Sequence, residues 1–349
     1  MASMKNYFRL LAEDKQHDAT SGLLQALLSI ASWGYGLGVR IFRGLYENKI
    51  LARKRLPYPV ISVGNLTWGG TGKTPFVEYL ARKIGTHRRV PLVLTRGYSH
   101  DEALELQNHL PAAIIGVGED RAKVAARVQE EKRHVDIAIL DDGLQHQKLA
   151  RDVDIIVINC LNPFGNGQLI PRGSLREPLS VLNRAAIIVL THVNLVSPEE
   201  LKTLKAKIAT LAPQAQLVET VMEVLFLYRA KTKVRVAIEK MAGRRVSTFA
   251  AVGTPRSFQL VLQRFQLKTV RNFEFLDHHE YTKEELLKVK EVAKSAGAEE
   301  IITTEKDFYR SRELISETLN PLVLAARLKV VSGDEILTDR LFRLLGVKN

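Results

Sequence analysis

The stretch VISVGNLTWGGTGKTPFVEYLARKI, from Val60 to Ile84, combines a short apolar run, a glycine-rich turn and a helix-like segment that opens with a proline. Strand, glycine-rich turn and helix in this order are the setting of a phosphate-binding loop, or P-loop. The common pattern G-x-x-x-x-G-K-[ST] has a glycine five residues before Gly72, where this chain has Thr67. A threonine there requires only that the first loop residue adopt a conformation open to a side chain. The stretch therefore predicts a nucleotide site with a variant loop.

The glycines of this loop let the backbone curl so that several N–H groups point at one phosphate, and the following helix adds a partial positive charge. The lysine would reach the β- and γ-phosphates, and the threonine after it would hold Mg²⁺. An ordinary glycine-rich turn is the competing interpretation, and the adjoining Lys-Thr pair makes it much weaker. The predicted nucleotide-binding residues of the loop are Gly69, Gly70, Thr71, Gly72, Lys73 and Thr74.

A second apolar run, Ile137 to Leu140, ends in the two aspartates Asp141 and Asp142. A P-loop needs an acid at the end of a neighbouring strand to orient its metal ion. Asp141 is therefore predicted to bind Mg²⁺, directly or through water. An Asp-Asp-Gly turn with no ligand is the alternative, and the P-loop upstream favours the site.

Further apolar runs rich in β-branched residues alternate with helix-like stretches along the chain. This pattern predicts an α/β fold with a doubly wound, mostly parallel sheet and a second, smaller α/β lobe. We expect an N-terminal membrane-associated segment at 1–56 and a P-loop core at 57–180. A C-terminal lobe at 181–349 would close over the active site and exclude water.

The composition limits the class of partner. The 349 residues are 46% hydrophobic and 26% charged, as expected of a folded chain, and carry a formal net charge of +13. Such a charge attracts nucleotides, phosphorylated substrates, anionic lipid or nucleic acid. A motif that reads nucleic acid is missing, so we expect no nucleic-acid partner. The single cysteine, Cys160, cannot form an internal disulfide, which indicates a reducing compartment.

The N-terminal region has no charged residue between Asp18 and Arg40. Its length suits a membrane-spanning helix, but polar and small residues recur on one helical face and argue against spanning. A basic segment with interleaved aromatic residues follows, which favours a helix lying in an anionic membrane interface. A helix packed on its own protein is an equal alternative. The polar face is formed by Gln25, Ser29, Ser32 and Gly36, and the basic segment contains Arg40, Arg43, Lys49, Arg53, Lys54 and Arg55.

Several motifs, taken in order, give the chain a family resemblance. After the P-loop come DDGLQH at 141–146, FGNGQLIPRGSLREP at 164–178, FLDHHEYT at 275–282 and TTEKD at 303–307. With these motifs the chain resembles the tetraacyldisaccharide 4′-kinases of lipid A biosynthesis. In that family the loop also has a residue other than glycine where Thr67 stands here.

The resemblance implies a kinase that uses ATP and Mg²⁺ at the cytoplasmic face of a bacterial inner membrane, to which it binds peripherally. Its substrate would be the glycolipid tetraacyldisaccharide 1-phosphate, phosphorylated on the 4′-hydroxyl to give lipid IVA. It also favours the interfacial helix, which would meet an anionic membrane surface. A regulatory, membrane-associated P-loop ATPase without a small acceptor is the alternative.

The resemblance also implies roles for single residues. Asp101 would be the general base and His278 its partner, because a carboxylate beside an imidazole can accept the proton of a sugar hydroxyl. Glu119 and Asp120 compete with Asp101 for this role. Lys73, Asp141 and Asp142 complete the implied catalytic set, and the further nucleotide-binding residues are His146, Arg176 and Glu177.

Three other segments carry weaker expectations. Arg172 and Arg176 are predicted to bind a lipid headgroup or a nucleotide phosphate, and a rigid connector is equally possible for their segment. TTEKD is expected to face the nucleotide or to close the lobes. LTHVN, at 190–194, stands where guanine-specific proteins have T/N-K-x-D, and its His192 and Asn194 argue against GTP.

Overall fold

The structure is a computed structural model that describes residues 19–97, 106–277 and 279–346. These residues form two compact units. The described part of unit 1 comprises 19–97, 106–220 and 330–346, and that of unit 2 comprises 221–277 and 279–329. The chain therefore leaves unit 1 within one strand, β7 (Gln216–Arg229), and returns to it within another, β12 (Leu322–Ser332).

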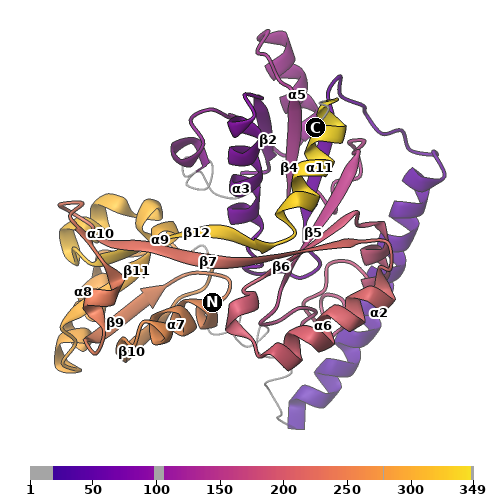
Figure 1. Cartoon of the computed structure of the whole chain (residues 1–349). Helices are drawn as coiled ribbons and strands as arrows, with labels where there is room; N and C mark the ends of the chain where they lie inside the picture. Colours follow the sequence, from indigo (N-terminus) through magenta and orange to yellow (C-terminus); the bar gives the residue numbers. More distant parts are fainter. Residues whose placement is uncertain (1–18, 98–105, 278, 347–349) are drawn as a thin grey trace. The chain divides into compact units, whose positions relative to one another are not determined.

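Unit 1 is built on a parallel sheet with the strand order β7-β6-β5-β1-β4-β2-β3 (Figure 1). The predicted α/β fold with a mostly parallel sheet is thereby confirmed. The strands of this unit, besides β7, are β1 (Val60–Gly64), β2 (Pro91–Thr95), β3 (Ile114–Val117), β4 (Ile137–Asp141), β5 (Val153–Asn159) and β6 (Ile187–Thr191). Its α-helices are α2 (Ala19–Glu47), α3 (Lys73–Thr86), α5 (Arg121–Glu130), α6 (Pro198–Leu211) and α11 (Asp334–Leu345).

The helices of unit 1 cover both faces of its sheet. The connection from β1 through α3 to β2 runs toward β3, whereas those through α5 and through α6 run the opposite way along the strand order. Connections between parallel strands are right-handed, so a reversal of direction places the helix on the other face. The fold is thus doubly wound, with α3 on one face and α5 and α6 on the other.

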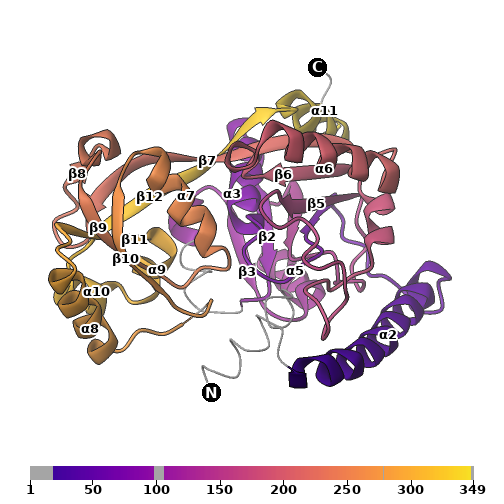
Figure 2. The same ribbon diagram turned by 90° about the horizontal axis from the view of Figure 1, so that it is seen from below.

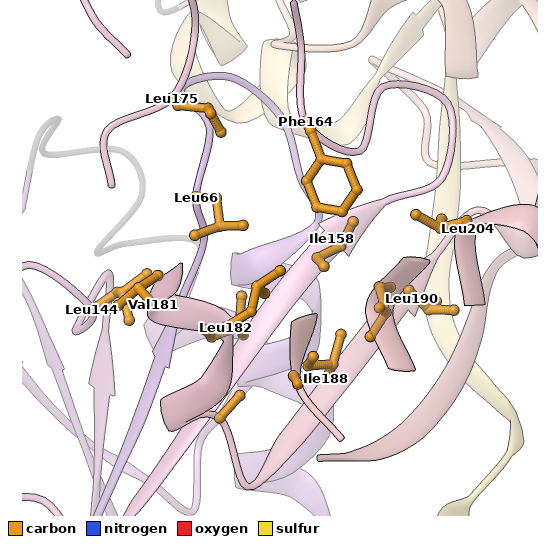
Figure 3. Packing of buried hydrophobic residues seen from close by; sticks show 14 of the residues in the cluster. Leu66, Leu144, Ile158, Phe164, Leu175, Val181, Leu182, Ile188, Leu190 and Leu204 are labelled. Carbon is orange, nitrogen blue, oxygen red and sulfur yellow. The ribbon is translucent and has the colours of Figure 1, made fainter. Parts of the chain in front are cut away.

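A hydrophobic cluster on the face of α6 joins the two predicted site segments (Figure 3). Leu66 follows β1 and Leu144 follows β4, and both belong to one cluster that also contains Ile158, Leu190 and Leu204. Each fully buried leucine contributes about 1.5 to 3 kcal/mol. The P-loop and the segment after Asp141 are therefore fixed to one common core.

A close approach at the end of β1 strengthens this connection. A Cβ atom on Gly64 would lie 2.5 Å from the Cβ of Leu144 and 2.8 Å from its backbone nitrogen. Only glycine permits the two backbones to pass at this distance, because any side chain would push them apart. The glycine that ends β1 is thus required by packing against the segment after β4.

The C-terminal helix α11 is attached to α3, the helix that follows the P-loop. Asp334 accepts hydrogen bonds from Tyr79 and, at 2.8 Å, from the ammonium group of Lys83. The ring of Phe342 meets His87 edge-on at 4.9 Å. The last described segment of the chain therefore packs beside a helix formed from its first hundred residues.

Unit 2 is a smaller α/β unit with the strand order β10-β9-β11-β12-β7. The pairs β9–β10, β9–β11 and β11–β12 are parallel, and β8 pairs antiparallel with β7. Its remaining strands are β8 (Arg235–Val236), β9 (Arg245–Ala250), β10 (Lys268–Glu274) and β11 (Glu300–Thr304). Its helices are α7 (Pro255–Arg264), α8 (Lys283–Ser295), α9 (Glu305–Arg310) and α10 (Arg312–Thr318).

The compact units divide the chain elsewhere than at the expected border near residue 180. Residues 181–220 belong to unit 1, because β6 pairs with β5 along its whole length and α6 packs on the same core. Residues 330–346 also belong to unit 1. The smaller unit is therefore an insertion within the larger one rather than its C-terminal neighbour.

The long helix α2 runs along the outer edge of unit 1 in both views (Figures 1 and 2). The part of its polar side around Ser32 and Gly36 faces the protein, whereas Ser29 is exposed. Ser32 donates a hydrogen bond to the carbonyl of Leu169, and a Cβ atom on Gly36 would lie 2.7 Å from the Leu169 side chain. Its apolar side faces outward and exposes Leu27, Ile30, Trp33, Leu37 and Ile41. The helix thus packs on its own protein and leaves these apolar residues uncovered, and its binding to a membrane interface stays a prediction.

Within 19–97, 106–277 and 279–346, every helix is too short or too polar to cross a bilayer.

Candidate active site

The P-loop and the predicted metal-binding acid lie at the same edge of the unit 1 sheet. β1 and β4 are parallel neighbours, and Val63 is in register with Asp141. The amide of Gly143 donates to the carbonyl of Val63 at 2.9 Å. Ligands of open parallel sheets bind beyond the carboxyl ends of the strands, which is where both segments emerge.

The P-loop places its left-handed conformations at two glycines. Gly69 and Gly72 have φ angles of 99° and 86°, and Gly72 immediately precedes α3. Thr67 instead forms an isolated antiparallel bridge with Leu175. This position therefore tolerates a β-branched residue, as the sequence required, because the glycine-only angles fall elsewhere in the loop.

Asn65 is the central hydrogen-bonding residue of the loop, and sequence reasoning missed it. Its side chain is fully buried and donates to the carbonyl of Thr67 at 2.6 Å and to the hydroxyl of Thr71 at 2.9 Å. Its amide oxygen accepts from the ammonium group of Lys73 at 3.0 Å and from the guanidinium group of Arg176. One side chain thus holds the loop backbone and both cations. The asparagine after Gly64 was the available signal.

Lys73, Asp142 and Arg176 form a compact charged group. The guanidinium of Arg176 makes two hydrogen bonds to the Asp142 carboxylate, at 2.9 and 2.6 Å. The Lys73 ammonium lies 3.4 Å from the same carboxylate. Burial would raise the pKa of Asp142, but the hydrogen bond from Arg176 and the charge of Lys73 outweigh it and hold that pKa far below its usual value. Asp142 is therefore ionised at neutral pH and partly neutralises both cations.

The two adjacent aspartates face different surroundings. Asp141 is the last residue of β4 and is buried, whereas Asp142 has a φ of 52° and turns away from the strand. This turn lets Asp142 reach Arg176 and leaves Asp141 at the strand end. Among the residues that the structure describes, no three His, Cys, Asp or Glu side chains gather as around a metal ion. Mg²⁺ commonly takes only one or two protein ligands and completes its shell with water and phosphate oxygens, so a carboxylate and a hydroxyl fit it chemically.

The segment that contains Arg176 packs directly against the P-loop. The Arg176 amide donates to the carbonyl of Leu66 at 2.7 Å, and the Trp68 amide donates to that of Ser174 at 3.0 Å. The Tyr35 hydroxyl of α2 donates to the Arg176 carbonyl at 3.0 Å. The segment is thus a rigid connection between α2 and the loop, and the same connection aims the Arg176 side chain at the charged group.

Glu177 and His146 occupy buried, basic surroundings. Burial raises the pKa of Glu177, and the charges of nearby arginines, first Arg43 and Arg184, oppose that rise. Burial, followed by the charges of Arg121 and Arg151, lowers the pKa of His146 to about 4. His146 is therefore neutral at pH 7 and provides one hydrogen-bond donor and one acceptor rather than a charge. Their predicted contact with nucleotide stays a prediction.

The predicted base, Asp101, and its predicted partner, His278, lie outside the described residues. The two competing carboxylates are described, and each has another role. Glu119 forms an exposed ion pair with Arg96 at 2.7 Å. Asp120 caps α5 by accepting hydrogen bonds from the amides of Ala122 and Lys123.

The TTEKD motif ends in a residue that holds unit 2 together. Asp307 is completely buried and accepts hydrogen bonds from the Tyr281 hydroxyl at 2.8 Å and the Ala251 amide at 2.9 Å. The Thr304 hydroxyl donates to it at 2.6 Å. The motif thus joins the end of β9 to the segment before α8. This role of Asp307 lies within unit 2, and the expectation that the motif faces the nucleotide or closes the lobes stays a prediction.

Known proteins resemble this chain over nearly its full length. Residues 24–345 match the sequence profile of the family described as tetraacyldisaccharide-1-P 4′-kinase. The chain is 33% identical to the probable mitochondrial tetraacyldisaccharide 4′-kinase of Arabidopsis thaliana, over 95% of this chain and 93% of the relative. It is 32% identical to the tetraacyldisaccharide 4′-kinase of Halothermothrix orenii, over 94% of each.

Its structure is similar to that of LpxK from Aquifex aeolicus in complex with ATP. The TM-score is 0.68 at 26% sequence identity, and the match covers 92% of this chain and 99% of the other.

Proposed function

Because the chain belongs to the tetraacyldisaccharide-1-P 4′-kinase family, we propose that it transfers the γ-phosphoryl group of ATP to the 4′-hydroxyl of tetraacyldisaccharide 1-phosphate. The product is the bis-phosphorylated lipid A precursor, lipid IVA. The observation that carries this proposal is the charged group of Lys73, Asp142 and Arg176 at the mouth of the P-loop. Transfer of a phosphoryl group depends mainly on positioning and on neutralising charge, which such a group supplies.

Different residues at this edge of the sheet would bind the phosphates and the metal ion of ATP. The P-loop amides between Gly69 and Thr74 would surround the phosphates, apart from that of Thr71, which donates to the carbonyl of Gly69. Lys73 would bind the β- and γ-phosphate oxygens. Thr74 and Asp141 would hold Mg²⁺, which would supply neutralisation of phosphate charge. Arg176 binds a phosphate oxygen or stays with Asp142, in which case it keeps that carboxylate away from the nucleotide.

The general base is proposed to be Asp101, with His278 as its partner. The described competitors already have structural roles, since Glu119 pairs with Arg96 and Asp120 caps α5.

We expect Asp101→Ala to lower kcat about 10²-fold, as the loss of a general base does. Glu119→Ala should leave kcat within about threefold of wild type, and Asp120→Ala should weaken the helix cap by about 1 kcal/mol with kcat little changed. Steady-state kinetics and thermal melting of the three variants check this. Near-normal turnover of Asp101→Ala would exclude the assignment.

The direct test of the function follows label from γ-³²P-ATP in detergent micelles, with and without tetraacyldisaccharide 1-phosphate. A labelled bis-phosphorylated lipid is expected only when the acceptor is present. A regulatory ATPase would instead release free phosphate at the same rate without lipid and would label none. The family match disfavours this alternative.

We also propose that α2 attaches the enzyme to the cytoplasmic face of a bacterial inner membrane. The outward side of α2 exposes Ile30 and Trp33, each with 70% of its surface accessible, and Arg40 further along the same helix is also exposed. An apolar helix face with a basic flank binds anionic membrane interfaces. The acyl chains of the substrate stay in the bilayer, so an enzyme held at the surface meets the sugar where it emerges.

Charges on the exposed side of α2 should release the protein from membranes. The double variant Ile30→Glu/Trp33→Glu is expected to lower binding to anionic liposomes about tenfold or more, because two apolar contacts are lost and two charges oppose the lipid. The matched control is Leu225→Glu/Val234→Glu, which makes the same change at exposed apolar positions of unit 2. Liposome sedimentation measures both, and equal binding of the α2 variant and the control would refute the interface.

A further inference from the structure

Two side chains at the ends of neighbouring strands hold the carbonyl groups of the P-loop. The hydroxyl of Thr191, the last residue of β6, donates to the carbonyl of Thr71 at 2.9 Å. The side-chain amide of Asn159, the last residue of β5, donates to the carbonyl of Gly70 at 3.1 Å. Both side chains are buried. The backbone on this side of the loop is therefore attached to the sheet at two consecutive peptides.

Fixing a carbonyl group also fixes the amide of the next residue. A trans peptide is planar and its C=O and N–H groups point in opposite directions. The bond from Thr191 thus sets the direction of the Gly72 N–H. The bond from Asn159 sets the peptide before it, whose Thr71 N–H donates within the loop to the carbonyl of Gly69 at 2.9 Å. A P-loop binds phosphate through N–H groups that converge on one point, so their direction decides how well the loop is prepared for its ligand.

The Thr191 hydroxyl is oriented from its other side by His192. The ring nitrogen Nδ1 of His192 lies 3.2 Å from the Thr191 hydroxyl oxygen. That hydroxyl has one hydrogen, and the carbonyl of Thr71 is nearer to it than that of Ile158, at 2.9 against 3.4 Å. Nδ1 must then donate, which assigns the tautomer with hydrogen on Nδ1. Burial lowers the pKa of His192 to about 4, so the ring is neutral at pH 7.

We propose that Thr191 and Asn159 are positioning residues of the nucleotide site, which hold the two peptides around Thr71 so that the loop has its shape, and the Gly72 N–H its direction toward the phosphates, before ATP binds. This inference rests on the proposed function only in taking the ligand to be a nucleoside triphosphate. Neither residue needs to touch ATP. His192 supports Thr191 by donating to its hydroxyl.

The contact between Thr191 and Gly72 allows the hydroxyl to be tested alone. A Cβ atom on Gly72 would lie 3.1 Å from the Thr191 methyl group, so that methyl fills the space beside the glycine. Thr191→Val keeps a methyl there and removes the donor, whereas Thr191→Ser keeps the donor. Thr220 is a matched control, because it is fully buried on β7 and its hydroxyl also donates to a backbone carbonyl, that of Leu190 at 3.1 Å.

The experiment measures binding of ATP with Mg²⁺ to the full-length protein in detergent by isothermal titration calorimetry, without lipid acceptor. Thr191→Val is expected to raise the Kd for ATP about tenfold, the effect of losing one oriented donor and leaving a buried carbonyl unpaired. Thr191→Ser and Thr220→Val should stay within about twofold of wild type. In turnover assays the KM for ATP should rise while the KM for the lipid stays unchanged.

The proposal would be overturned if Thr191→Val bound ATP with the wild-type Kd. It would also be overturned if Thr220→Val lost as much ATP affinity as Thr191→Val. Failure of Thr191→Ser to restore binding would also contradict it. If Thr191→Val does not fold, Asn159→Ala decides, with the same expected loss of ATP affinity and the same overturning result. Because no acceptor is present, these outcomes are independent of which hydroxyl the enzyme phosphorylates.

Discussion

Replacing Lys73 with methionine is expected to lower kcat for transfer from ATP to the lipid about 10³-fold. The ammonium group is held 3.0 Å from the amide oxygen of Asn65 and 3.4 Å from Asp142, beside the loop that receives the phosphates. A charged donor that is already in place when charge develops contributes at least 10²- to 10³-fold. Methionine keeps an unbranched side chain only one atom shorter and removes the charge, so folding should be nearly normal.

Lys83→Met is the matched control for this variant, since it makes the same change on the same helix. Lys83 pairs with Asp334, not with the loop. Its loss should lower the melting temperature slightly, because a partly exposed ion pair contributes about 1 kcal/mol or less. Its kcat should remain near wild type. Comparable kcat values for the two variants would remove Lys73 from the mechanism and with it the P-loop interpretation.

Asp142→Asn is expected to lower the free energy of unfolding at pH 7 by about 3 kcal/mol, because a mostly buried pair loses one partner and two cations remain. The pKa of Asp142 is depressed in the folded protein. Its contribution to stability is therefore complete above the pKa of the unfolded chain, near 4, and is lost as the pH falls toward the folded value. The difference between wild type and variant should narrow steadily below about pH 4.

Urea unfolding at a series of pH values measures this difference. Asp334→Asn is the control, because Asp334 also has a lowered pKa and a lysine partner but its side chain is 49% exposed. It should shift the unfolding midpoint far less. A difference between wild type and Asp142→Asn that is independent of pH would contradict the role of charge in this group.

Local patterns in the sequence were sufficient to predict the position of the glycine-rich loop and the fold class. The glycines, Lys73 and Thr74 lie within one strand-turn-helix unit, and apolar runs predicted a mostly parallel α/β sheet that the structure confirms. The sequence does not predict which strands pair with each other, because the strands of a parallel sheet all have similar apolar sequences. The border at residue 180 was placed by the chain order alone, whereas β6 belongs with β5.

Side-chain contacts between residues far apart in the chain could not be predicted from the sequence either. Arg176 was predicted to bind a phosphate, and nothing in the sequence indicated that it would hold Asp142. The sequence does not indicate the role of Asn65, because that role comes from hydrogen bonds to four different groups. One of these groups, the Arg176 guanidinium, lies 111 positions after Asn65 in the chain. Thr191 and Asn159 each end an apolar run, and only the fold brings them to the loop.

The attachment of α11 to α3 has a consequence for synthesis on the ribosome. Asp334 lies 255 positions after Tyr79, its partner on the helix behind the nucleotide loop. At typical elongation rates that interval lasts on the order of tens of seconds. Throughout this time the nascent α3 has no α11 beside it. By its end the strands from β1 to β6 have been synthesised, but α3 is still without this partner. A messenger cut short within the coding region for α11 would therefore give a chain that has every loop residue but an open side on the helix that carries Lys73.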